Sequence, residues 1–204
     1  MSDCSSTGRC MLVLLSASYF HCRERSAKAY GAFAYLTAEL LVLIPMNIVN
    51  VFVYCVTLYY MAELTNAQGA FGFFYFILLV VNFIGLFQCQ IVSNLASTTQ
   101  AAMSYFPIAL FFSVAFAGFI VYLPQFPNWL SWGPDITFMR YAFQALTLNE
   151  FVDNGDLPDE NYYIDNLGFN DLTKGECVPI LLVFLGAYWL ISLLTMRFIN
   201  WEQR

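Results

Sequence analysis

The chain has 204 residues, of which 60% are hydrophobic and only 11% are charged. A soluble domain is typically about a quarter charged and about half apolar, so this composition excludes an ordinary water-exposed fold. Acidic residues account for the net charge of −6, and most of them lie in one segment, between Asp135 and Glu176. The composition therefore indicates an integral membrane protein with one acidic segment outside the hydrocarbon layer. Nothing in it indicates a nucleic-acid partner.

The stretch from Leu64 to Pro134 contains no Asp, Glu, Lys or Arg. Polar points near 66–69 and 97–100 divide it into apolar runs of roughly 20 residues, the length that a helix needs to cross about 30 Å of hydrocarbon. Lipid offers the backbone no hydrogen-bond partner, so each span must be a helix or part of a closed barrel. The runs lack the alternation of barrel strands, which predicts an all-α membrane fold.

Four transmembrane helices are predicted, at about 36–61, 71–92, 102–123 and 179–199. Before them, residues 1–18 form a divergent segment to which we assign no structure. Basic and aromatic residues mix in 19–35, a pattern typical of an interfacial helix, or of a basic flank that orients the next span. In the first span Pro45 should kink the helix, and Asn47 and Asn50 should face other helices, because polar groups are costly in lipid.

Orientation follows from basic residues in the short flanks of the first and last spans, which are Arg9, Arg23, Arg25, Lys28, Arg197 and Arg204. Positive flanks favour the cytosol, so both termini, including the tail 200–204, are predicted to be cytosolic. The loop 124–178 is then external.

This loop contains a helical pattern from Ile136 to Phe151, where apolar residues recur every three and four positions. The pattern predicts a short helix that either dips back into the outer face of the membrane or lies flat on it. Arg140 lies within this helix and is expected to pair with Asp135 or Glu150.

The chain offers little catalytic chemistry of its own. It has one histidine, His21, no GxxxxGK[ST] motif to hold ATP phosphates, and six cysteines without a CxxC pair. Cys177 is the one cysteine in the predicted outer loop, where it is either an intersubunit disulfide partner or an unpaired thiol at a helix start. We therefore predict no enzymatic activity for this chain alone.

Three groups of short motifs follow one another in a specific order. The first is Arg23-Glu24-Arg25-Ser26-Ala27 with Tyr30, which resembles R-E-R-A-A-x-x-Y. The second comprises Pro127 to Trp132, Arg140-Tyr141-Ala142-Phe143 and Asn149-Glu150-Phe151, which resemble P-x-W-L-x-W, R-Y-x-F and N-E-F. The third comprises Gly168-Phe169 and Phe198 to Arg204, which resemble G-F and F-x-N-[FW]-x-x-R. Together they resemble the membrane domain of ABC transporters of the G subfamily, the white and pleiotropic-drug-resistance group.

The resemblance implies that 36–199 is the last four spans of a six-span domain, and that 19–35 is a cytosolic connecting helix touching an ATPase domain. The implied activity is ATP-driven export of lipids, sterols or hydrophobic xenobiotics. ATP and magnesium would then bind a separate or missing nucleotide-binding domain. Membrane lipids, that domain and a second transmembrane half, in a homo- or heterodimer, are the implied partners. The location is expected to be the plasma membrane.

The resemblance also assigns residues to roles. The substrate cavity falls on Leu110, Phe111 and Val114, which are expected to share a helical face with Gly118. The gate falls on Phe119 and Ile120. Coupling to the motor falls on Arg23, Glu24 and Arg25. The residues that shape the external loop are Trp129, Trp132, Arg140, Tyr141 and Glu150.

Departures from the family pattern leave a second interpretation open. The P-loop and the first two spans are missing, and Ala17-Ser18 replaces the Glu-Arg usually found upstream of the connecting helix. We therefore expect residues 1–18 to belong to a truncated or mis-started product. The alternative is a four-span scaffold or interaction protein without transport activity, as in tetraspanins, although that family needs several loop cysteines.

Overall fold

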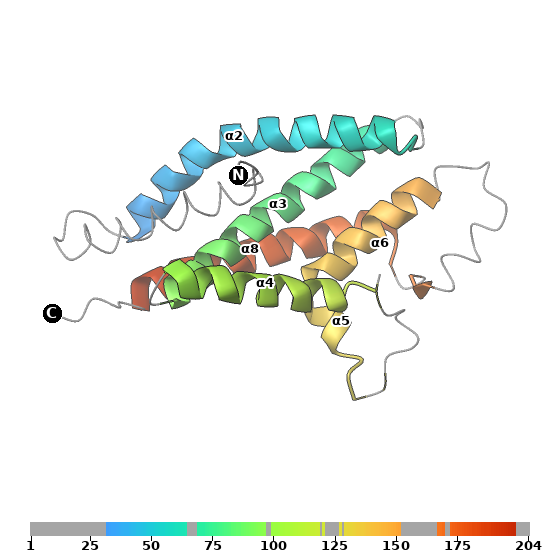
Figure 1. The fold of residues 1–204 in the computed structure, drawn as a ribbon. Helices are drawn as coiled ribbons and strands as arrows, with labels where there is room; N and C mark the ends of the chain where they lie inside the picture. Colours follow the sequence, from blue (N-terminus) through green and yellow to red (C-terminus); the bar gives the residue numbers. More distant parts are fainter. Residues whose placement is uncertain are drawn as a thin grey trace, which may run out of the picture. The chain divides into compact units, whose positions relative to one another are not determined.

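The structure is a computed structural model that describes residues 32–64, 69–96, 99–118, 120, 127, 129–151, 167–169 and 172–198. The regular elements within these ranges are helices: α2 (Ala32–Met61), α3 (Ala70–Leu95), α4 (Thr99–Ala115), α5 (Gly133–Ile136), α6 (Phe138–Phe151) and α8 (Lys174–Phe198) (Figure 1). The predicted all-α fold class is thereby confirmed.

Three of the described helices are long and apolar enough to cross a membrane: Leu40–Met61 within α2, Ala70–Leu95 and Lys174–Phe198. The last begins before the predicted start at 179. Its first turn is fixed by Glu176, whose carboxylate accepts hydrogen bonds from the backbone N–H and the hydroxyl of Thr173, at 2.8 and 2.9 Å. An acid in the first turn also suits the positive end of the helix dipole.

The predicted third span, 102–123, is helical only to Ala115, so α4 is a shorter apolar helix. The amide of Ala117 bonds the carbonyl oxygen of Val114 at 3.1 Å, which tightens the chain after the last helical turn. Gly118 then has φ 83°, a left-handed conformation that glycine adopts without strain and that ends a helix. The expectation that Gly118 shares a helical face with Leu110 is therefore wrong.

The chain divides into two compact units, to both of which the long helices α2, α3, α4 and α8 contribute. One unit contains residues 46–83 and 110–185, and the other contains the chain up to Pro45 with 84–109 and 186–204.

In the unit of 46–83 and 110–185, the end of α2 lies beside the start of α3 (Figure 1). The two helices pack through aromatic rings. Tyr59 of α2 meets Phe71 and Phe74 of α3 edge-on, with ring centroids 5.1 and 5.5 Å apart. Such pairs add about 0.5–1.5 kcal/mol each to the burial of their surface. Asn47 of α2 is buried as predicted, whereas Asn50 is exposed, so the expectation that both face other helices holds for one of them.

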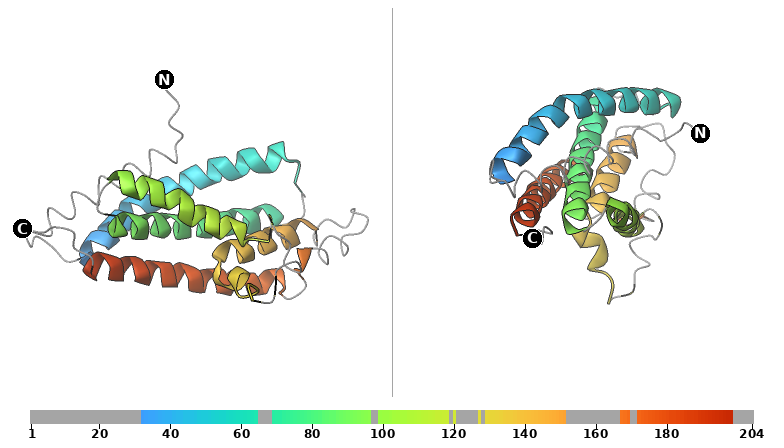
Figure 2. Two further views of the ribbon diagram at one scale, coloured as in Figure 1. Left: turned by 60° about the horizontal axis from the view of Figure 1, so that its bottom comes forward. Right: turned by 60° about the vertical axis from the view of Figure 1, so that its left-hand side comes forward.

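In the other unit, the ends of α3 and α8 lie side by side (Figure 2). They share polar contacts between side chains. The hydroxyl of Ser192 donates to Oε1 of Gln90 at 3.3 Å, and the amide of Asn94 donates to the hydroxyl of Thr195 at 3.3 Å. Both residues of the first pair are buried. These contacts satisfy polar groups that would be costly to leave unpaired in lipid.

Candidate functional site

The last turns of α4 present apolar side chains outward. Phe111 is 70% exposed, whereas Leu110 and Val114 are half-buried on the same helix. Beyond the helix Ile120 is also exposed. Its predicted companion in the gate, Phe119, lies outside the described residues. The structure thus leaves the predicted cavity residues available to a ligand or a facing chain within the part that it describes.

Phe112 belongs to this exposed apolar end, although its sequence position gave no signal for it. Its ring is half-exposed and lies against that of Phe116, with centroids 4.7 Å apart. The opposite side of the helix end is anchored, because Ser113 and Ala117 are buried. We call Leu110, Phe111, Phe112, Val114 and Ile120 the apolar end of α4.

The turn of residues 129–137 is fastened to this helix end. The hydroxyl of Thr137 lies within bonding distance of the carbonyl oxygens of Phe116 and Pro134, at 3.4 and 3.1 Å. Gly133 is buried, and a Cβ atom there would lie 2.5 Å from Cε1 of Phe116. Only a residue without a side chain lets the turn approach the Phe116 ring so closely.

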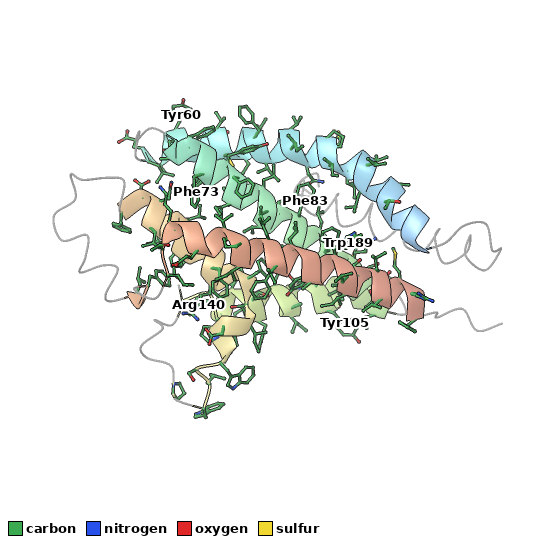
Figure 3. All side chains as sticks on the ribbon, turned by 180° about the vertical axis from the view of Figure 1, so that it is seen from behind. Tyr60, Phe73, Phe83, Tyr105, Arg140 and Trp189 are labelled. Carbon is green, nitrogen blue, oxygen red and sulfur yellow. The ribbon has the colours of Figure 1, made fainter. Side chains whose placement is uncertain are left out.

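Arg140 lies on α6 with its side chain almost fully buried (Figure 3). Its guanidinium pairs with the carboxylate of Asp135, so one of the two predicted partners is confirmed. The hydroxyl of Tyr141 donates to the carbonyl oxygen of Asp135 at 3.3 Å. Burial raises the pKa of Tyr141 above its ordinary value, although the charge of Arg140 opposes the shift. Glu150, the other predicted partner, is half-buried near the end of α6.

α6 contains two buried amides to which the sequence assigned no role: Gln144 was not singled out, and Asn149 was named only as part of the N-E-F motif. Gln144 is fully buried, and its Nε2 donates to the carbonyl oxygens of Phe169 and Leu172, at 3.2 and 3.4 Å. Asn149 is 1% exposed, and its amide donates to the carbonyl oxygen of Ala70 at 3.2 Å. The sequence signal that could have identified them is an amide side chain at a position that the helical pattern predicts to be buried.

Lys174 completes this arrangement from the first turn of α8. Its ammonium donates to Oδ1 of Asn149 at 3.3 Å and lies 5.2 Å from the ring centroid of Phe73 on α3. Asn149 therefore joins the starts of α3 and α8 to the end of α6. We call Asn149, Lys174 and the carbonyl of Ala70 the amide junction.

The apolar stripe of α6 is buried within its unit. Phe138, Ala145 and Leu148 are each less than a tenth exposed, and Leu148 packs with Phe169. The predicted helix from Ile136 to Phe151 is thus observed as α6, which begins after a break at Thr137. How deep it lies in a membrane stays a prediction.

Cys177 is fully buried at the start of α8 and forms no disulfide. Of the two sequence interpretations, the structure supports the unpaired thiol, because a buried sulfur cannot reach a second subunit. Among the described residues, no three His, Cys, Asp or Glu side chains gather as metal ligands. The predicted coupling residues Arg23, Glu24 and Arg25 lie outside the described residues.

Residues 5–151 match a family model described as ABC-2 type transporter. ABC transporter G family member 12 of Dictyostelium discoideum is 26% identical over 89% of this chain and 31% of its own length. ABC transporter G family member 7 of Arabidopsis thaliana is 31% identical over 63% of this chain and 18% of its own length. The broad substrate specificity ATP-binding cassette transporter ABCG2 of Mus musculus is 28% identical over 74% of this chain and 22% of its own length. The chain thus spans less than a third of each of these relatives.

Proposed function

The chain belongs to the ABC-2 type transporter family, and from that premise we propose that it lines the path of an ATP-driven exporter of lipids, sterols or hydrophobic xenobiotics. The observation that carries the proposal is the apolar end of α4. Phe111 is 70% exposed there, while Ser113 of the same helix and Ala117, just beyond its end, are buried in the protein interior. A fixed helix with an outward apolar surface suits cargo that prefers lipid to water.

Apolar contacts of this kind are strong enough for selection and weak enough for release. Complete burial of a Phe or Leu side chain stabilises a complex by about 1.5–3 kcal/mol. Phe111 and Ile120 together would therefore hold a hydrophobic molecule without binding it irreversibly. Tighter binding would oppose transport, because only differences between states can drive a cycle.

The motor and the facing half of the transporter are parts of the same proposal. We propose that ATP and magnesium bind a nucleotide-binding domain, which Arg23, Glu24 and Arg25 couple to the membrane helices. A second transmembrane half would close the cavity, because the apolar end of α4 is open in a single chain. The plasma membrane, with both termini in the cytosol, is the proposed location.

The proposal is tested by ATP-dependent uptake into inside-out membrane vesicles from cells that make the protein. Probes are a labelled phospholipid, a labelled sterol and an apolar dye. Phe111→Ala is expected to raise the half-saturating concentration of the transported probe by about tenfold, the equivalent of roughly 1.4 kcal/mol of lost contact. Val183→Ala is the matched control, since Val183 on α8 is equally exposed at 71% and lies in the same unit.

Two results would overturn the proposal. One is the absence of ATP-dependent uptake of all three probes while the protein is present and bound to an ATPase, as a scaffold without transport activity would behave. The other is an equal loss in the Phe111 and Val183 variants. An antibody against residues 153–165 locates the motor: a band well above 23.3 kDa places it on the same polypeptide, and a band at 23.3 kDa on a partner.

A further inference from the structure

Two tryptophans stand outward on the turn that follows α4. Trp129 is 74% exposed and Trp132 is 54% exposed, and Ile136 on the same turn is 59% exposed. Large apolar side chains gathered in one exposed place mark a surface that meets something other than water. Neither the transport path nor the family match assigns these residues a partner.

The turn holds the two indoles in a fixed position. The indole N–H of Trp132 donates to the carbonyl oxygen of Trp129 at 2.8 Å. Backbone bonds from Leu130 to Pro127 and from Gly133 to Leu130, at 2.8 and 2.9 Å, close the turn. Since Gly133 also lies against the ring of Phe116, the indoles cannot withdraw into the protein without breaking these contacts.

The turn of residues 129–137 has few charged residues and its carboxylate is paired, which suits contact with lipid better than contact with water. No Asp, Glu, Lys or Arg occurs between Leu64 and Pro134, so residues 129–134 of the turn are uncharged. The next residue is Asp135, and its carboxylate pairs with Arg140. A paired carboxylate costs less to bring near hydrocarbon than a single one.

The surface formed by the two tryptophans adjoins the exposed apolar end of α4. Phe111 and Phe112 are exposed on the last turns of α4, and the turn is fastened to that helix end through Phe116. Indole rings combine an apolar body with a polar edge, and tryptophan is enriched where membrane hydrocarbon meets water.

We propose that Trp129 and Trp132 insert into the headgroup boundary of the bilayer and anchor the turn, and with it the end of α4, at that depth. The occupant of this surface is lipid, not a second protein. The anchor would fix how far the end of α4 can move along the membrane normal. This inference does not depend on transport activity, so it can fail or hold independently of the proposed function.

Tryptophan fluorescence in vesicles tests the depth of the pair. The chain has four tryptophans, and Trp189→Phe with Trp201→Phe leaves only Trp129 and Trp132. Vesicles of phosphatidylcholine carry bromine either just below the headgroups or near the bilayer centre, and iodide quenches from the water. We expect the shallow bromines to quench at least about twofold more than the deep ones, and iodide to quench weakly.

The matched control retains Trp189 alone, through Trp129→Phe, Trp132→Phe and Trp201→Phe. Trp189 lies within the apolar span α8, so deep bromines should quench it more than they quench the pair. If the variant that lacks Trp189 and Trp201 does not fold, the signal of the pair is obtained by difference. The quenching of the variant with Trp129→Phe and Trp132→Phe is then subtracted from the quenching of the unmodified chain. Circular dichroism checks the helix content of every variant.

Either of two outcomes overturns the inference. Strong quenching by iodide with little quenching by either bromolipid would mean that the turn lies in water. Fluorescence that neither iodide nor bromolipid reduces would mean that protein, such as a second copy of the chain, covers the indoles.

Discussion

Replacing Asn149 should destabilise the fold, because this residue links segments that are distant in the sequence. Its side chain is 1% exposed, donates to the carbonyl oxygen of Ala70 at 3.2 Å, and accepts from the ammonium of Lys174 at 3.3 Å. It therefore connects segments that are 79 and 25 residues away along the chain. Asn149→Ala deletes both bonds and leaves the three helix ends without this link.

The magnitude follows from the two bonds. A neutral hydrogen bond contributes about 0.5–1.5 kcal/mol, and one to a charged group about 1.5–3 kcal/mol. Lys174 is half-buried, so solvent weakens its bond and the lower part of that range applies. We expect a loss of about 2–3 kcal/mol, which for a chain of this length lowers the midpoint of thermal unfolding by roughly 4–12 °C.

Thermal unfolding of the purified chain in detergent, followed by tryptophan fluorescence, measures this loss. Thr147→Ala is the matched control on the same helix. Thr147 is also buried, but its hydroxyl bonds the carbonyl oxygen of Phe143 on α6 itself, at 2.8 Å. The control should therefore lower the midpoint by only a few degrees, about a third of the effect of Asn149→Ala.

A double-mutant cycle separates the bond between Asn149 and Lys174 from other effects of the substitutions. Because both single variants delete the same bond, Asn149→Ala combined with Lys174→Met should cost about 1 kcal/mol less than the sum of the two. Additive losses, or a midpoint for Asn149→Ala equal to that of Thr147→Ala, would refute the amide junction as a stabilising link.

Further substitutions test the packing within each of the two units. Gly133→Ala should destabilise by about 1–3 kcal/mol, because its Cβ would meet the Phe116 ring at 2.5 Å, and Phe116→Leu should restore part of the loss. Gly186→Ala on α8, where a Cβ meets nothing within 4 Å, should instead stabilise the fold by about 0.5–1 kcal/mol. Thermal midpoints that shift in the same direction in the Gly133 and Gly186 variants would contradict this account. Gln90→Leu and Ser192→Ala should each cost about 0.6 kcal/mol with a coupling of similar size, measured by a double-mutant cycle, and strictly additive losses would argue against the bond.

The sequence by itself determined the fold class and the family. Runs without charge require helices, because lipid cannot satisfy the backbone, and this holds whichever neighbours the helices have. That Arg140 pairs with an acid was also predictable, because a cation in an apolar helix needs a nearby acid, but the sequence left Asp135 and Glu150 as alternatives and the structure shows the pair with Asp135. Local spacing carries this kind of information.

Tertiary structure alone decided which polar groups the interior uses. Asn47 and Asn50 look equivalent in the sequence, yet one is buried and the other exposed. The apolar pattern predicted a third span that continues past Ala115, whereas α4 ends there. The prediction was too long because apolar residues continue in the sequence beyond the left-handed turn at Gly118. Periodicity states which residues share a face, but not which neighbour covers it. The bond from Asn149 to Ala70 joins residues 79 positions apart, so only the packed chain brings the two together.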